Sequence, residues 1–126
     1  RFNRFSLTLG LGYDSPRNVA DSYFIFAYPY LVTVPGYEVT VRGLPAGERE
    51  RNLEALQFIS SEAARRGLHF QLGLWGHNYK CTNSPDVNYL IDGLNEGNPA
   101  QYGLDAVRTL RQACPAISGS TFRAHY

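Results

Sequence analysis

The stretch Leu68–Trp75, "LHFQLGLW", decides the fold of this chain. Its composition is typical of a β-strand, and its length suits a strand that is covered on both faces. Arg65 and Arg66 precede it, followed by Gly67, and this order is typical of the end of a helix. The chain therefore passes from a helix into a buried strand through a very short connection.

The helix that ends there is predicted to run from Glu48 to Arg66. Its apolar side chains recur at helical spacing, at Leu53, Leu56, Ile59 and Ala63. Further upstream, Phe5–Leu11, "FSLTLGL", has the composition of a first strand. Between them lies the aromatic segment Tyr23–Val41, in which Pro29 and Pro35 rule out one long helix, so we expect a long, partly structured loop.

A second unit repeats this plan after the decisive strand. Residues 84–99, "SPDVNYLIDGLNEGNP", read as a long loop. Asn98 is then predicted to cap a helix, with Pro99 at its first position and Gln101 completing a capping box. The expected buried stripe of this helix is Tyr102, Ala106, Val107, Leu110 and Ala113, and Pro115 ends it. Ile117–Ala124 is the third predicted strand.

The alternation of strands and helices predicts an α/β fold with a parallel sheet and both helices on one side of it. The strand-to-helix loops are long and the helix-to-strand returns are short, which is typical of (β/α) barrels and also of open doubly wound sheets. The first loop, "GLGYDS", lacks the third glycine of a dinucleotide-binding fingerprint, so no such cofactor is expected.

The composition excludes several classes of partner. A net charge of +1 over 126 residues gives no electrostatic reason to expect nucleic acid or an anionic membrane, and no apolar run approaches the roughly 20 residues of a membrane span. The aromatic fraction of 13% is high, and many of these residues lie in loops. Cys81 and Cys114 show no metal-binding spacing, and whether they pair stays open. The chain starts without Met and stops at a strand exit, so we expect a piece of a longer polypeptide.

Aromatic and polar residues follow each predicted strand. Because the carboxyl ends of parallel strands meet at one edge, we expect these side chains to form one site. Flat rings can stack on sugar C–H faces, while imidazole, amide and guanidinium groups can hold hydroxyls, so carbohydrate is the expected ligand. The predicted substrate-binding residues are Tyr13, Asp14, Trp75, His77, Asn78, Tyr79, Arg123 and His125.

Several of these residues also have a structural interpretation. Trp75 can cap the strand core, Asp14 can form a turn, and Arg123 can point into an ion pair inside a barrel. Asp14, His77 and His125 are the candidate catalytic residues. No neighbouring residue completes a metal-ligand motif such as HExxH, so no metal or cofactor is predicted. His69 lies at the opposite end of its strand and is excluded from the site.

Two further sets remain open between function and structure. Tyr28, Tyr30 and Tyr37 form either a wall or lid over the site or a loop whose aromatic rings bury one another. The carboxylates of the two long loops are expected to be solvated, and no catalytic pair can be named among them, since glycosidases hold two carboxyls roughly 5 to 10 Å apart.

The segments "RFNRFSLTLGLGYD", "YFIFAYPYLVTVPGYEV", "RGLHFQLGLWGHNY" and "CPAISGSTFRAHY" together resemble an internal part of bacterial glycoside-hydrolase-like (β/α)₈ (TIM) barrel proteins. The resemblance implies that residues 1–126 form one fragment of a larger barrel domain, with about three parallel strands and two main helices. It also implies sugar-contacting groups at the strand ends, at Asp14, Trp75, His77, Arg123 and His125. The acid/base glutamate found past a middle strand in many such barrels has no counterpart here, so the fragment alone is expected to be inactive.

The predicted function is hydrolysis of glycosidic bonds by carboxylate acid/base catalysis in the parent protein. The expected partners are a carbohydrate ligand and the remainder of the barrel. One alternative is a metal-dependent barrel isomerase or hydrolase that uses Asp14, His77 and His125, and another is a non-catalytic glycan-binding barrel. The localisation stays open, and a secreted or periplasmic one is compatible with the resemblance.

Overall fold

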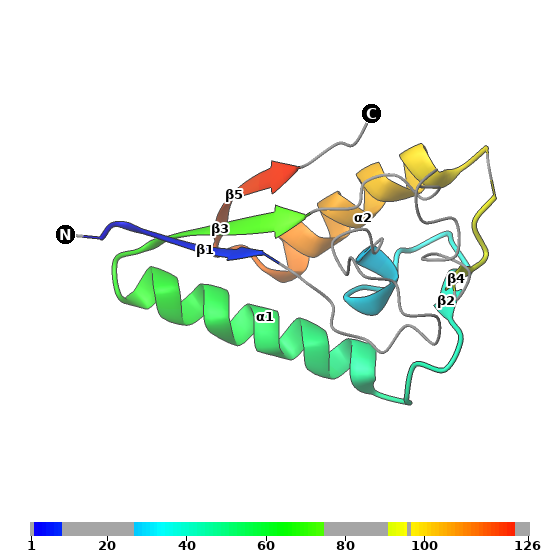
Figure 1. The fold of residues 1–126 in the computed structure, drawn as a ribbon, viewed down its shortest axis with the longest axis horizontal. Helices are drawn as coiled ribbons and strands as arrows, with labels where there is room; N and C mark the ends of the chain where they lie inside the picture. The colour runs from blue at the N-terminus through cyan, green and yellow to red at the C-terminus, as the bar shows by residue number, and fades with distance from the viewer. Residues whose placement is uncertain (1, 9–26, 75–90, 96, 123–126) are drawn as a thin grey trace, which may run out of the picture.

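The computed structural model describes residues 2–8, 27–74, 91–95 and 97–122 of the chain. Three parallel strands and two helices alternate along the sequence, as predicted, and a second small sheet joins them (Figure 1). The elements are, in order, β1 (Arg4–Thr8), η2 (Tyr28–Tyr30), β2 (Thr40–Val41), α1 (Glu48–Arg65), β3 (His69–Leu74), β4 (Ile91–Asp92), α2 (Pro99–Ala113) and β5 (Ile117–Phe122).

The main sheet has the order β1-β3-β5, with every neighbouring pair parallel. The predicted α/β class is therefore confirmed, and the decisive stretch forms the central strand. Residues 9–11 of the first predicted strand, and the ends of the other two, lie outside the described residues. The sheet of three strands does not close on itself, so the fold that is shown is an unclosed α/β sheet and not a barrel.

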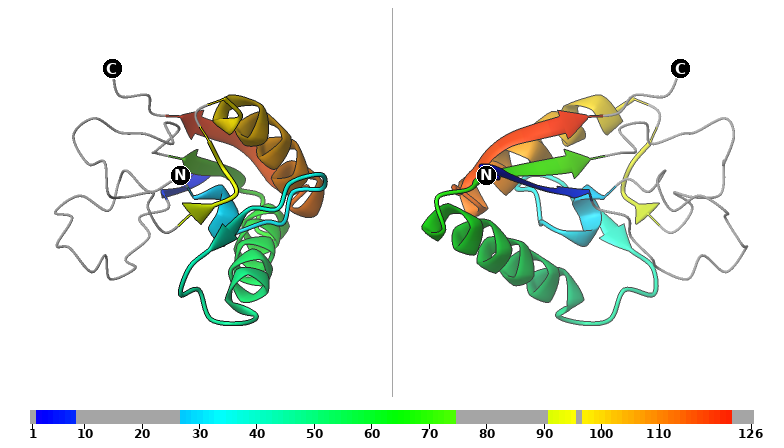
Figure 2. Two further views of the ribbon diagram at one scale, coloured as in Figure 1. Left: turned by 90° about the vertical axis from the view of Figure 1, so that its right-hand side faces the viewer. Right: turned by 60° about the vertical axis from the view of Figure 1, so that its left-hand side comes forward.

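Both helices cover the same face of this sheet, as the crossover rule predicts (Figure 2). Phe70, Leu72 and Leu74 of β3 alternate along the strand, point to this face and are buried. They pack in one core with the buried stripes of the helices. Gln57 on α1 also donates to the carbonyl of Ala113 at 2.9 Å, which provides a partner for one of the last carbonyls of α2.

The prediction that β3 is covered on both faces holds for its carboxyl half, where Leu72, Gly73 and Leu74 are all buried, but not for its amino half. His69 is exposed and Gln71 is half-buried, and both lie on the face opposite the helices. The amino half of the strand therefore alternates between a buried apolar side and a polar side, which is the pattern of a sheet with one covered face.

Helix α1 begins at Glu48 as predicted and ends at Arg65, one residue before the predicted end. Its stripe is the predicted one, with Leu56 and Ala63 buried and Leu53 and Ile59 partly so. Glu48 in its first turn and Arg65 in its last turn both complement the helix dipole. Gly67 follows with φ of 75°, a conformation that glycine adopts without strain, and this turn sends the chain directly into β3.

Helix α2 begins at Pro99 as predicted, but the predicted capping box does not form. Asn98 is the N-cap residue without a side-chain cap hydrogen bond, because its Oδ1 accepts from the backbone N–H of Asn95 instead. Gln101 reaches forward to Asp105 at 3.0 Å rather than back to the cap. The Asn98 side chain therefore binds the backbone of the turn before the helix instead of the first N–H groups of the helix.

The two segments predicted as long loops contain short elements that the sequence pattern does not indicate. Thr40–Val41 pairs antiparallel with Ile91–Asp92, and the side chains of Val41 and Ile91 are buried in the core. Residues 27–34 form the short helix η2 and its flanks, which lie between α1 and α2 (Figure 1). Arg49 on α1 fixes this segment by donating to the carbonyl of Pro29 at 2.7 Å.

Candidate functional site

The three main strands end together at one edge of the sheet. Thr8 is paired with Gly73, and Leu74 is paired with Phe122, so the last residues of β1, β3 and β5 are neighbours in the register. In parallel α/β proteins ligands bind at the carboxyl ends of the strands. The chain therefore leaves three adjacent strands at the edge where a ligand site is expected.

The predicted sugar-contacting residues follow these strand ends in the sequence. Trp75 comes directly after Leu74, and Arg123 comes directly after Phe122. All eight predicted site residues lie outside the described residues: Tyr13, Asp14, Trp75, His77, Asn78, Tyr79, Arg123 and His125. The same is true of Cys81, whereas Cys114 is described as a buried free cysteine whose pKa is raised by burial. The structure thus places the strand ends and not the side chains that follow them.

Gly73 allows β1 and β3 to approach closely near this edge. A Cβ atom at this position would lie 2.8 Å from Thr8 Oγ1 and 3.2 Å from Thr8 Cα. Only a residue without a side chain fits there unless the two strands move apart. The close approach holds the ends of β1 and β3 side by side at the edge where the predicted site residues follow.

Two of the three aromatic loop residues, Tyr28 and Tyr30, are part of the core, which favours the structural interpretation for them, whereas Tyr37 is partly buried. Tyr28 and Tyr30 are 2% and 3% exposed and belong to the core. Burial raises the pKa of Tyr28, as expected for a phenol shielded from water. Tyr37 packs edge-on against Tyr102, with ring centroids 5.1 Å apart, and burial raises the pKa of Tyr102 to about 12.

A hydrogen-bond network joins this loop to α2. The Tyr37 hydroxyl donates to Asp105 Oδ2 at 2.7 Å, Gln101 donates to the same oxygen, and Arg108 lies 3.3 Å from Oδ1. The hydrogen bonds from Gln101 and then from Tyr37 lower the pKa of Asp105. The bond to Asp105 in turn raises the pKa of Tyr37 above 10.0.

Replacing Tyr37 by phenylalanine is expected to destabilise the protein more at neutral pH than in acid. Folding lowers the Asp105 pKa, so the resulting stabilisation is full above the ordinary value of 3.8 and is lost as the pH falls through the lower folded-state value. Tyr37→Phe removes one bond that causes this shift. Urea denaturation should therefore give a smaller difference in free energy of unfolding between the wild type and Tyr37→Phe at about pH 3 than at about pH 7. A difference that is the same at both pH values, or that shrinks equally in an Asp105→Asn background, would contradict this assignment.

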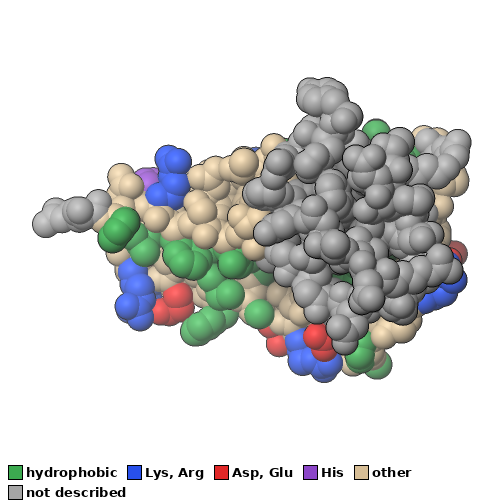
Figure 3. All heavy atoms as spheres, in the orientation of Figure 1, with side chains coloured by type: hydrophobic (Ala, Val, Ile, Leu, Met, Phe, Trp, Pro, Cys, Tyr) green, Lys and Arg blue, Asp and Glu red, His purple; other side chains and the backbone are tan. Residues whose placement is uncertain are grey.

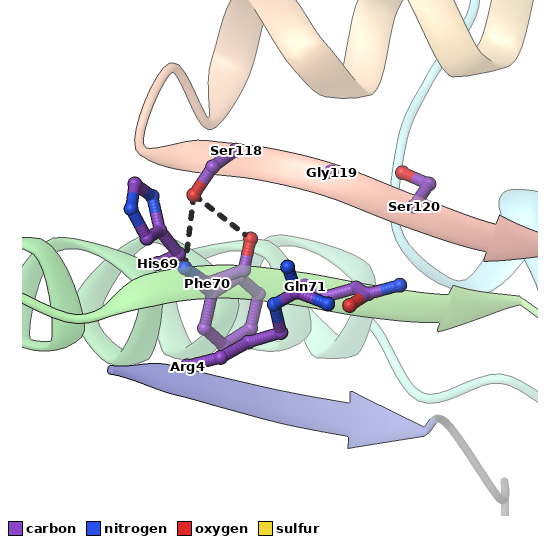
Figure 4. Close-up of a pocket in the computed structure, with 7 residues that line it drawn as sticks. All are labelled: Arg4, His69, Phe70, Gln71, Ser118, Gly119 and Ser120. Carbon is purple, nitrogen blue, oxygen red and sulfur yellow. Dashed lines mark hydrogen bonds between the residues drawn. The ribbon is translucent and has the colours of Figure 1, made fainter. Parts of the chain in front are cut away.

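A second polar feature lies on the face of the sheet that the helices leave open, at the amino end of the strands (Figure 4). It is a hollow of about 290 Å³ lined by Arg4 from β1, His69 to Gln71 from β3, and residues 118–120 from β5. His69 lies there, as predicted, at the end of its strand opposite the expected sugar site. Gln71 is held in place by a hydrogen bond to Thr121 across β3 and β5.

A bulge in β5 shapes this hollow. Phe70 is paired with Ile117 and Gln71 with Gly119, so Ser118 is an extra residue on the β5 side. Its hydroxyl accepts from the Phe70 N–H at 2.9 Å and donates to the Phe70 carbonyl at 3.2 Å (Figure 4). The Ser118 hydroxyl thus satisfies the backbone N–H and carbonyl of Phe70, which the bulge leaves without backbone partners on β5.

Sequence reasoning did not single out Arg4, Gln71 or the bulge. The alternation of His69, Gln71 and Gly73 within the decisive stretch is the one signal that indicates a polar face. A bulge in a parallel pair leaves no comparable sequence signal, because serine and glycine also occur in ordinary strands and loops.

The remaining surface of the described residues is apolar in two places. A groove of about 450 Å³ lies between α2 and the end of β5 and is lined by Leu104, Val107 and Phe122 among others. Figure 3 shows a band of hydrophobic side chains above the acidic and basic groups of α1. Phe5 on β1 and Phe58 on α1 are 41% and 68% exposed.

The described residues contain neither a candidate metal centre nor a candidate membrane-spanning helix. No three His, Cys, Asp or Glu residues among them gather closely enough to hold a metal ion. None of their helices is both long and apolar enough to cross a membrane. No family model, curated protein or solved structure matches the chain.

Proposed function

We propose that this chain forms part of a (β/α)-barrel in a carbohydrate-active protein that hydrolyses glycosidic bonds at the carboxyl edge of the sheet. The observation that carries the proposal is the register of the main sheet. It makes the ends of β1, β3 and β5 neighbours. Each of the three sequence runs that suit a sugar begins within a few residues of one of these ends.

The strand order and the placement of the helices favour a barrel rather than a doubly wound sheet. Each strand is added next to the preceding one, in the order β1-β3-β5, and both crossovers pass over the same face. A doubly wound sheet reverses its strand order and covers both faces with helices. Here the uncovered face carries Arg4, His69 and Gln71, which do not suit the apolar surface that a second layer of helices requires.

The exposed apolar surface supports the remainder of a barrel as partner. The groove along Leu104 and Phe122 borders β5, and the exposed Phe5 lies on β1, so apolar surface occurs at both edges of the sheet. In a closed (β/α)₈ barrel each edge strand pairs with another strand, and each helix packs against its neighbours. Further barrel units on both sides would bury this surface.

The proposed chemistry divides the predicted residues by type. Trp75 and Tyr79 stack on the sugar rings, and His77, Asn78, Arg123 and His125 hold hydroxyls, in keeping with the hydrogen-bonding capacity of each group. A carboxylic acid protonates the glycosidic oxygen while a second carboxylate acts as nucleophile or activates water. Asp14 is the only carboxylate among the predicted residues, so at least one of the pair comes from elsewhere in the protein.

Substitution in the full-length protein tests this assignment. Trp75→Ala and His77→Ala are each expected to weaken the affinity for a hydrolysed oligosaccharide by about tenfold or more, since each removes one direct ligand contact. Phe58→Ala is the matched control, because this aromatic side chain is exposed on α1, outside the proposed site. Isothermal titration calorimetry measures the affinity, and a reducing-sugar assay measures the turnover. Wild-type affinity and turnover in both variants would refute the site.

The same assays separate the alternatives. Glycan binding without turnover across a panel of oligosaccharides would replace the hydrolase with a glycan-binding barrel. Activity that is lost on chelation and restored by zinc or manganese would instead indicate a metal-dependent enzyme that uses Asp14, His77 and His125.

A further inference from the structure

The face of the main sheet opposite the helices carries no apolar side chain among the described residues. The positions on this face are Arg4, Ser6 and Thr8 on β1, His69, Gln71 and Gly73 on β3, and Gly119 and Thr121 on β5. In the proposed barrel this face turns toward the interior, which large branched apolar side chains fill in most (β/α) barrels. A barrel that closes over this face therefore needs polar side chains from its other strands here.

Arg4 brings a permanent positive charge to this face. Its side chain reaches from β1 toward Gln71 on β3, while the ring of His69 points away from the guanidinium (Figure 4). Within the described part of the chain the guanidinium makes no salt bridge or hydrogen bond, and none of the residues that line the hollow is Asp or Glu. Arginine stays protonated in proteins, so closing a barrel moves a charged group away from water. This is strongly unfavourable unless an opposite charge compensates.

We infer that a carboxylate on a strand outside residues 1–126 pairs with Arg4 in the interior of the barrel. The inference rests on the barrel of the proposed function and names the chemistry of the partner that closes over this face. The interior of a (β/α)₈ barrel is just wide enough for side chains from opposite walls to meet. The hollow of about 290 Å³ provides the room, because a Cβ atom at Gly119 would meet no atom within 4 Å. The planar guanidinium can donate to both oxygens of the carboxylate.

Removing the charge of Arg4 in the full-length protein tests the inference. Arg4→Met is expected to lower the melting temperature by about 6 °C or more at about pH 7, since it leaves a carboxylate buried without a partner. Arg4→Lys keeps the charge and should avoid at least about half of this loss. Arg111→Met is the matched control, because it removes the same charge from an exposed position on α2, and should shift the melting temperature by less than about 2 °C.

The pH dependence separates a lost charge pair from lost packing. In the wild type the paired carboxylate has a lowered pKa, so the pair contributes fully at neutral pH and its contribution is lost as the pH falls through that pKa. In Arg4→Met the buried carboxylate has a raised pKa, and the proton that it takes up in acid relieves the cost of its burial. The difference in melting temperature should therefore shrink by at least about half between about pH 7 and about pH 4. His69 is the other titratable group that lines the hollow, so the comparison is repeated in a His69→Gln background.

Modification by phenylglyoxal, which reacts with accessible arginines, decides the question even if Arg4→Met does not fold. In the wild-type full-length protein Arg4 should react about tenfold or more slowly than Arg111. Equal reaction rates, equal effects of Arg4→Met and Arg111→Met, or a loss that does not shrink in acid would each overturn the inference. If Trp75→Ala weakens glycan binding in that case, the sugar site still stands. A protected and charge-paired Arg4 in a protein that binds no glycan would support the inference and refute the proposed sugar site.

Discussion

Replacing Phe70 by alanine is expected to lower the free energy of unfolding by about 3 to 5 kcal/mol, the usual cost of removing a buried aromatic side chain. Phe70 is 0% exposed and stands in the central strand, between its register partners Phe5 and Ile117. Its ring lies 5.8 Å from the ring of Phe5, measured between centroids. A loss of this size is a large share of the 5 to 15 kcal/mol that stabilises an ordinary domain.

Urea denaturation followed by circular dichroism measures this loss, and Phe58→Ala provides the control. Phe58 is 68% exposed on α1, and alanine is the better helix former, so this variant is expected to change stability by less than about 1 kcal/mol. Equal effects of the two substitutions would show that the helix-covered face of β3 is not the core of the protein.

Replacing Gly93 by alanine is expected to cost about 2 to 4 kcal/mol, through a steric clash and an unfavourable backbone angle together. Gly93 has φ of 92° and follows β4 directly. A Cβ atom there would lie 2.0 Å from the carbonyl oxygen of Glu38, which is backbone and cannot rotate away. The substitution must therefore push apart β2 and β4, whose residues Val41 and Ile91 reach the core.

Gly36→Ala separates the two causes. Gly36 has a similar φ of 86°, but no atom lies within 4 Å of its Cβ position, so only the backbone term of about 1 kcal/mol remains. Chemical denaturation of both variants should give a clearly larger loss for Gly93→Ala. Equal losses would mean that Gly93 and Glu38 do not approach each other as closely as described.

The elements that were predictable from the sequence are those that a periodic pattern and a clear stop specify. The recurrence of Leu53, Leu56, Ile59 and Ala63 predicted α1, and Gly67 marked its end to within one residue. Because short returns and long crossovers constrain parallel strands, the alternation of elements also predicted that both helices would lie on one face.

The elements that escaped prediction depend on partners distant in the sequence. Thr40–Val41 is too short for a periodic signal and forms a strand only because Ile91–Asp92 lies beside it. Tyr28 and Tyr30 have the composition of an exposed aromatic loop, yet they fill the space between two helices that sequence alone does not place. Tertiary packing decides the conformation in both cases.

Of the candidate site, the structure bears on one part alone, the prediction that three strands end side by side at one edge of the sheet. The register confirms that Thr8, Leu74 and Phe122 end neighbouring strands, and the ligand groups expected after them stay a prediction. The rule that parallel strands end together does not fix the orientation of the side chains that follow, because loop conformation depends on turns and contacts without periodic patterns. The polar face around Arg4 was missed because alternation along a strand separates its two faces but does not tell which face the helices cover.

Hydrogen–deuterium exchange of the full-length protein, with and without an oligosaccharide that it binds, tests directly whether the sugar site lies at the carboxyl edge of the sheet. We predict slower exchange in three separate segments together, residues 9–14, 75–79 and 123–126, because each follows one of three strands that end at the same edge. The α1 peptide, residues 48–65, should exchange at an unchanged rate. Protection in other segments while these three are unaffected, or no binding by any glycan of a broad panel, would contradict a sugar site at this edge.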